Sequence, residues 1–72
     1  MTNRKEYYAI EKIGTVNTWY VIVKVTIDNY TGITTRPVNG CRFKVATDAF
    51  EKAENLGLDI KAIGDSYDII LK

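Results

Sequence analysis

The stretch Thr18–Asp28, TWYVIVKVTID, decides the fold because it alternates over its whole length. Its odd positions are all large and apolar: Trp19, Val21, Val23, Val25 and Ile27. Its even positions are mixed: Tyr20, Ile22, Lys24, Thr26 and Asp28. A period of two carried by aromatic and β-branched residues predicts a strand. We therefore expect the odd row to form a buried face and the even row to form a presented face.

Turn residues divide the rest of the first half into further strands. Tyr7–Ile13 is a candidate first strand, and Gly14–Asn17 turns into the long strand. Ile33–Val38 and Cys41–Val45 follow, with Asn39-Gly40 between them. That dipeptide fits a two-residue type I′ hairpin or, alternatively, a bulge within one longer bent strand. None of these connections has room for a crossover helix, so we expect a wholly antiparallel sheet.

One helix follows the strands, at about residues 48–56. Asp48 and Glu51 have the spacing of a capping box, and Gly57 sits where a C′ glycine belongs. Residues at i, i+3 and i+4 spacing form a narrow apolar stripe that should cover the inner row of the sheet. The stripe comprises Ala49, Phe50, Ala53 and Leu56. With a last strand over Tyr67–Leu71, the sequence predicts an α+β fold: a small antiparallel sheet of three to five strands with one helix on one face.

Composition limits the classes of protein to which the chain can belong. Its 72 residues suit a single domain, 1–72, in which residues 1–6 are expected to be a flexible lead-in. The single cysteine, Cys41, excludes an intramolecular disulfide, and residues 1–6 lack the apolar stretch of a secretion signal. No apolar run approaches the ~20 residues of a membrane span. We therefore expect a cytoplasmic protein without a membrane partner.

The chain offers little for catalysis or metal binding. It contains no histidine, which removes the commonest general base and, with one cysteine, any zinc site within a single chain. Asp59, Asp65 and Asp68 match no calcium loop and are expected to form a solvated rim. Cys41 alternates in register with Phe43 and is expected to be a core residue. We expect no enzymatic activity, no cofactor and no metal.

The charges separate along the chain. Residues 1–46 carry a balance of +4 and residues 47–72 a balance of −3, so the sheet half is basic and the helix half acidic. Unbroken alternation would place one aromatic ring and four cations on the outer face: Tyr20, Lys24, Arg36, Arg42 and Lys44. Such a face can neutralise phosphates and stack on bases, so nucleic acid is one candidate partner. A solvated face and a face for an acidic protein are the alternatives, and a break at Pro37–Gly40 would shift the parity of the later cations.

Four isoleucines lie on faces opposite to the main apolar rows of their strands: Ile10, Ile22, Ile63 and Ile70. Together they would form an exposed apolar patch on a half-wet sheet. One interpretation is that the C-terminal tail folds back over them. The other, which we favour, is a symmetric homodimer that pairs these patches or joins strand edges.

The run TWYVIVKV…DNYTGITTRPVNGCRFKVATDAFEKAENLG, covering about residues 18–57, resembles a known module. It is similar to the three-strands-then-helix, arm-type DNA-binding domain at the N-terminus of phage and transposon integrases. The positions that carry the resemblance are Trp19-Tyr20, Asp28, Thr31-Gly32, Gly40, Phe43, Thr47, Ala49 and Ala53. The resemblance implies a sheet that enters the major groove, with contacts at Tyr20, Lys24, Arg36, Arg42 and Lys44.

The small size and the lack of catalytic chemistry also resemble small phage and prophage proteins, many of which bind a host or phage protein. We therefore expect a small accessory or regulatory module that acts by binding an unidentified protein partner. Weak nucleic-acid binding through the basic sheet face is the alternative.

Overall fold

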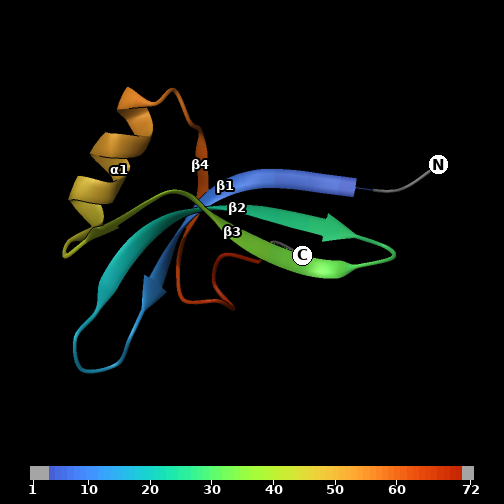
Figure 1. Cartoon of the computed structure of the whole chain (residues 1–72), viewed down its shortest axis with the longest axis horizontal. Helices are drawn as coiled ribbons and strands as arrows, with labels where there is room; N and C mark the ends of the chain where they lie inside the picture. Colours follow the sequence, from blue (N-terminus) through green and yellow to red (C-terminus); the bar gives the residue numbers. More distant parts are fainter. Residues whose placement is uncertain (1–3, 71–72) are drawn as a thin grey trace.

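Residues 4–70 fold into four strands and one helix, which confirms the predicted α+β class. The computed structural model describes residues 4–70, without the side chains of residues 39 and 41. The elements in chain order are β1 (Arg4–Ile13), β2 (Trp19–Asp28), β3 (Gly32–Phe43), α1 (Ala46–Asn55) and β4 (Ile60–Gly64). In the sheet the strands lie in the order β3-β2-β1-β4 (Figure 1).

The sheet is mixed, because β4 runs parallel to β1. β1, β2 and β3 form two antiparallel ladders, as the sequence predicts. α1 then carries the chain from β3 at one edge of the sheet to β4 at the other. A helical connection of this kind returns the chain in the direction of the strand that it left. The prediction of a wholly antiparallel sheet is therefore wrong, because α1 is itself the crossover.

The sheet buries side chains on both faces, and the two faces have different covers. Figure 1 shows α1 above the sheet and the segment after β4 below it. The cluster under α1 comprises Ile10, Ile22, Ala49 and Ala53. The cluster on the other face comprises Tyr7, Ala9, Val21, Val23, Val25 and Ile69. The predicted inner row of β2 is buried at Val21, Val23 and Val25, whereas its two ends, Trp19 and Ile27, are half-buried. The prediction that the helix covers this row is wrong, because α1 packs on the row that contains Ile22.

The segment after β4 is a tight helical turn in place of the predicted last strand. The Ile69 amide donates to the Asp65 carbonyl at 3.2 Å. The Asp65 carboxylate accepts two further bonds, from the Tyr67 amide at 2.9 Å and from the Asp68 amide at 3.1 Å. An aspartate that accepts amide bonds two and three residues ahead closes a turn locally, and this overrides the weak alternation of the tail. The prediction of a strand over 67–71 is wrong for residues 67–70, and Leu71 lies outside the described residues.

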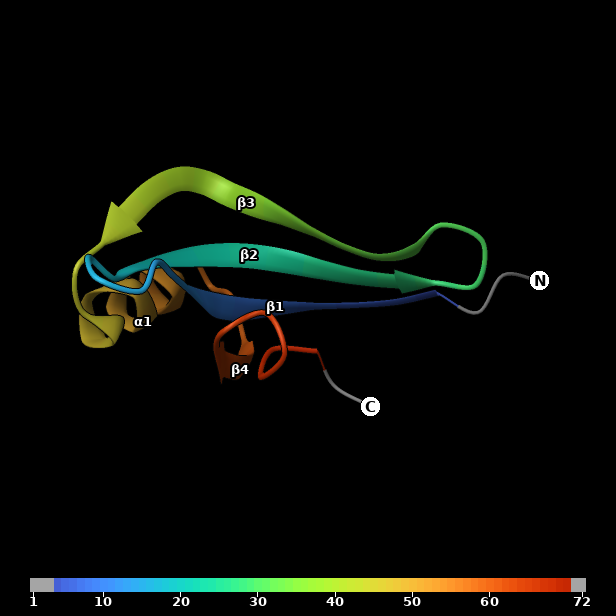
Figure 2. The same ribbon diagram turned by 90° about the horizontal axis from the view of Figure 1, so that it is seen from below.

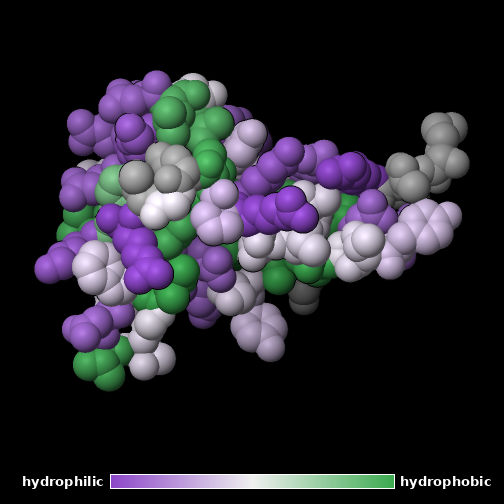
Figure 3. Space-filling view, viewed as in Figure 1, coloured by the Kyte–Doolittle hydropathy of each residue, from purple (hydrophilic) through white to green (hydrophobic). Residues whose placement is uncertain are grey.

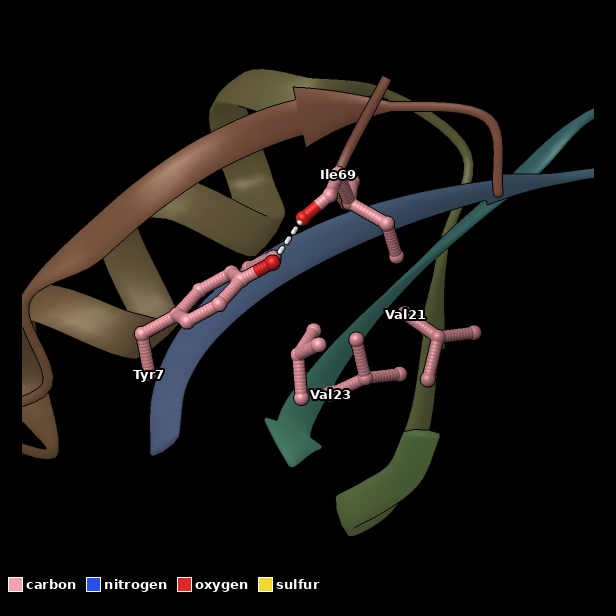
Figure 4. Packing of buried hydrophobic residues seen from close by; sticks show 6 residues of the cluster. Tyr7, Val21, Val23 and Ile69 are labelled. Atoms are coloured by element: carbon pink, nitrogen blue, oxygen red, sulfur yellow. Dashed lines mark hydrogen bonds between the residues drawn. The ribbon is translucent and has the colours of Figure 1, made fainter. Parts of the chain in front are cut away.

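A buried hydrogen bond fastens this turn to the sheet. The Tyr7 hydroxyl on β1 donates to the Ile69 carbonyl at 2.6 Å (Figure 4). The Ile69 side chain is fully buried against the valines of β2. The turn therefore covers its face of the sheet through one apolar side chain and one polar anchor.

α1 begins at Ala46, two residues before its predicted start. Its N-cap, Val45, makes no side-chain cap bond, so the predicted capping box of Asp48 and Glu51 does not form. Asp48 instead lies in the first turn, where a carboxylate favours the positive end of the helix. At the other end Gly57 has φ 75°, which confirms the predicted C′ glycine.

Two alanines hold α1 against the sheet. Ala49 and Ala53 are fully buried, and their small side chains let the helix approach the strands closely. Phe50 and Leu56, predicted to share this buried stripe, remain 44% and 45% exposed. Only the alanines of the predicted stripe are therefore buried against the sheet, and its largest side chain, Phe50, stays partly exposed.

The paired strands extend well beyond α1 and form an arm (Figure 2). This arm consists of Arg4–Tyr8 of β1, Val23–Asp28 of β2 and Gly32–Pro37 of β3. Its first residues, Arg4–Glu6, were predicted to belong to the flexible lead-in, but they pair with the end of β2. The arm makes the molecule elongated, with extents of 39 × 28 × 19 Å.

Candidate functional site

The five side chains predicted to share one binding face lie on two faces. Lys24 and Arg36 are cross-strand neighbours on the side of the sheet that α1 covers. Tyr20 lies on the same side but packs half-buried against the cluster beneath the helix. Arg42 pairs with Val21, so it lies on the opposite side. Lys44 follows it there, with its ammonium 5.6 Å from the centre of the Trp19 ring.

A bulge in β3 causes this separation. In the β2–β3 ladder, Val23 pairs with Pro37 and Val21 pairs with Arg42. The four residues of β3 between these two pairs therefore lie opposite a single residue of β2. The three extra residues are an odd number, and an odd shift moves every later side chain to the other face. Gly40 supplies the positive φ of 73° within the bulge. Asn39-Gly40 is thus the bulge of one bent strand and not a hairpin turn.

Two cations of the arm, Arg4 and Lys24, share one acidic partner. The Arg4 Nε lies 3.2 Å from Glu6 Oε1, and the Lys24 ammonium pairs with the other carboxylate oxygen. The hydrogen bond from Lys24, aided by the positive charge of Arg4, holds the pKa of the Glu6 carboxyl below its ordinary value. Among the described residues Arg36 has no ion pair. A hollow of about 380 Å³ lies over this part of the arm, between Arg4 and Arg36.

A second and more apolar surface lies between α1 and β4. It is a groove of about 510 Å³, lined by Ala46, Thr47, Phe50, Glu51, Glu54 and Ile63. Phe50 and Ile63 are its large apolar side chains and are 44% and 43% exposed. Glu51 and Glu54 form an acidic rim along the helix wall. Figure 3 shows apolar atoms gathered over the end of α1 and its connection to β4, while polar atoms line the arm.

Register and helical spacing explain why these groove residues meet. Ile63 pairs with Ile10 across the parallel β1–β4 ladder, so its side chain lies on the side of the sheet that α1 covers. Phe50 and Glu54 stand one position along from the buried Ala49 and Ala53, which places them on the flank of the helix. The sequence pattern indicates Ile63 only as a residue of self-association, and it does not indicate Glu51 or Glu54 as residues of a binding site.

The predicted self-association patch is divided among three environments. Ile10 and Ile22 are fully buried beneath α1, so the prediction that they form an exposed surface is wrong. Their burial follows from the packing of α1 on the even row of β2. Ile63 lies in the groove, and Ile70 is half-buried in the turn after β4.

Within the described residues the structure brings together no catalytic or metal-binding constellation. No three His, Cys, Asp or Glu side chains in this part of the chain lie close enough to hold a metal ion. No charged side chain there is buried. Asp65 and Asp68 meet through backbone hydrogen bonds of the turn, whereas Asp59 pairs with Lys61 at 2.7 Å. No helix in residues 4–70 has the length and apolar character needed to cross a membrane.

Comparison with known proteins adds no relative. No protein-family model, curated protein or solved structure matches this chain.

Proposed function

We propose that this chain is a non-enzymatic protein-binding module and that the groove between α1 and β4 receives its partner. One observation carries the proposal: Phe50 and Ile63 line the groove with nearly half of each side chain in water. Removing apolar surface from water is favourable by about 25 cal/mol per Å², and the part of this that exceeds the cost of association appears as affinity. The acidic rim of Glu51 and Glu54 selects a partner segment that carries positive charge as well as apolar residues.

Selection from a library of displayed random peptides tests the proposal. Peptides enriched on the immobilised chain are expected to combine apolar residues with an excess of Lys and Arg, and to lose binding to Phe50→Ala. Tyr67→Ala is the matched control, because Tyr67 is an exposed aromatic residue outside the groove. The proposal fails if no peptide is enriched, or if the enriched peptides bind Phe50→Ala as well as they bind the unmodified chain.

A phage-type accessory or regulatory role belongs to this proposal and rests on the sequence resemblance. In such a role the module would occupy a segment of a host or phage protein without altering it chemically.

Nucleic-acid binding by the arm is a second candidate function. Arg36 stands directly opposite Lys24 on the neighbouring strand, and within the described residues Lys24 pairs with Glu6 whereas Arg36 has no ion pair. The charge of Arg36 therefore supports binding of an external anion at this place. In this version of the hypothesis Arg42 makes no contact, since it lies on the other face. Fluorescence anisotropy with single- and double-stranded oligonucleotides tests it. Binding that falls steeply with salt, that is lost in Arg36→Glu and that survives in Arg42→Glu would support the arm, whereas no signal at tens of micromolar protein would exclude it.

A homodimer remains a candidate assembly, with Ile63 and Ile70 as its remaining predicted contacts. A symmetric pair that met through the groove would bring the two acidic rims together, so the charges favour a different partner there. Light scattering at high concentration tests this assembly. A monomer mass would exclude the dimer and leave the groove free for a partner.

A further inference from the structure

The face of the sheet on which α1 packs is wider than one helix. Four strands about 4.8 Å apart form a face about 19 Å wide, whereas a helix with its side chains is about 10 Å across. α1 packs against β1, β2 and β3. The groove lies on the remaining side of this face, where β4 supplies Ile63. Its position beside α1 suits a second element of helical width.

The wall of the groove has the pattern of a helix–helix contact. Thr47, Phe50, Glu51 and Glu54 stand at i, i+3, i+4 and i+7, which is one continuous stripe along the flank of α1. Helices that pack side by side lie about 8–10 Å apart, nearer where the side chains are small. Ala46 and Thr47 at the start of the stripe allow that approach, and Phe50 gives the stripe a large apolar centre.

The charge of the groove specifies the second helix further. Within residues 4–70, Glu51 and Glu54 form no ion pair. The half of the chain that contains them, residues 47–72, is acidic as a whole, with a balance of −3. We infer that the partner presents a basic amphipathic α-helix that lies beside α1, an inference that rests on the proposed protein-binding function. Its apolar stripe contacts Phe50 and Ile63, and its Lys or Arg side chains reach the rim.

An extended segment fits this surface less well. A strand that pairs with the outer edge of β4 would lie a further ~4.8 Å from α1. It would satisfy backbone groups of β4 but leave the space between Phe50 and Ile63 unfilled. A helix laid in the groove covers both apolar side chains at once, which is the recognition mode of amphipathic helices in apolar grooves.

Titration of the ¹⁵N-labelled chain with three synthetic 14-residue peptides tests the inference. The first peptide carries Leu at i, i+3 and i+4 spacing with Lys elsewhere. The second has the same composition and charge, but two central D-residues prevent a helix. The third replaces every Lys with Glu. With the first peptide we expect chemical-shift changes at the amides of Phe50, Glu54 and Ile63. The second peptide should bind at least about tenfold more weakly, and the third should show no binding.

Two variants that change the net charge equally supply the control. Glu54→Gln removes a rim charge and is expected to weaken the first peptide by about threefold, the range of a partly exposed ion pair. Asn55→Lys, on the exposed residue that follows it and outside the groove, is expected to leave binding within about twofold. Equal weakening in the two variants would indicate a net-charge effect and would overturn the inferred rim contact.

The outcomes separate this inference from the function on which it rests. If the helical and the helix-broken peptides shift the groove amides with equal affinity, the groove binds protein segments but not a helix, and the inference alone is wrong. If no peptide shifts these amides at millimolar concentration, the inference is also wrong, and the display selection then decides the protein-binding function independently.

Discussion

The two faces of the sheet are closed by covers of different size and strength. α1 closes one face with two buried alanines, and its flank leaves Phe50 exposed in the groove. A single turn closes the other face, with Ile69 as its buried side chain and Tyr7 as its anchor. The first face therefore combines core and the proposed binding surface, whereas the second depends on a few local contacts. Changes to the two faces should accordingly affect stability by different mechanisms.

The largest expected effect is on the helix-covered face. Ile22→Ala removes a fully buried side chain at the centre of the cluster beneath α1. Truncations of this kind lower the free energy of unfolding by about 2–5 kcal/mol. Because the total for a small domain is only about 5–15 kcal/mol, urea denaturation should show a large loss. Ile33→Ala, at a half-exposed position, is the control and should lower the free energy of unfolding by less than about 1 kcal/mol.

The next effect should detach the turn without disturbing α1. Gly64 has φ 150°, and a Cβ built there would lie 2.4 Å from the Cβ of Asp68. Gly64→Ala therefore requires the turn to shift, and we expect a loss of about 1–3 kcal/mol, the range of backbone strain. Hydrogen exchange should quicken at the Ile69 amide while that of Ala53 keeps its protection.

Gly32→Ala separates strain from collision in the same comparison. Gly32 also has a positive φ, of 82°, but a Cβ there meets no atom within 4 Å. It should therefore show only the backbone penalty, without faster exchange in the turn. Equal losses of stability in the two variants would mean that the collision with Asp68 adds nothing to the backbone penalty.

A smaller effect isolates the polar anchor. Tyr7→Phe keeps the ring and removes the hydroxyl that donates to the Ile69 carbonyl at 2.6 Å. A buried hydrogen bond of this kind stabilises a fold by about 1 kcal/mol, and the carbonyl left behind adds to the loss. Tyr67→Phe, at an 88% exposed ring, should change the free energy of unfolding by less than about 0.5 kcal/mol. Thermal unfolding curves that coincide for the two variants would show that the anchor is unimportant.

Local patterns predicted the strands better than they predicted the covers. The alternation of β2 identified both of its rows, since side-chain parity follows directly from the backbone. It could not tell which row would meet α1, because Ile10 and Ile22 on one side and the valines on the other are both apolar. The choice depends on the crossover to β4 and on the two small alanines, which are features of the tertiary fold.

The sequence predicts the face on which a site residue lies only where it also predicts the register of the strands. The cations up to Arg36 follow the parity of β2, but the length of the bulge at Gly40 is not encoded in any local period. Phe50 occupies a position of the predicted apolar stripe, and only packing decides that its neighbours Ala49 and Ala53 take the buried flank. The groove was missed for that reason, although an acidic helix with one bulky apolar residue offered a partial signal.

The smallest expected effect lies on the arm, beyond the reach of α1. The pKa of the Glu6 carboxyl is lowered by its hydrogen bond to Lys24 and by the charge of Arg4. A carboxyl with a lowered pKa in the folded state contributes stability above its unfolded pKa and loses that contribution as the pH falls through its folded pKa. The difference in stability between the unmodified chain and Glu6→Gln should therefore be slight at neutral pH and vanish in acid.

NMR titration of the Glu6 carboxyl carbon checks this directly. The midpoint should lie below the ordinary value of 4.5 and should rise towards it at high salt, because the group and its partners are solvent-exposed. The midpoint should also rise in Lys24→Gln. It should stay low in Lys12→Gln, because Lys12 is an exposed residue of β1 that makes no ion pair within the described residues. A midpoint unmoved by Lys24→Gln would show that Lys24 forms no ordered ion pair with Glu6 and is free to meet another anion.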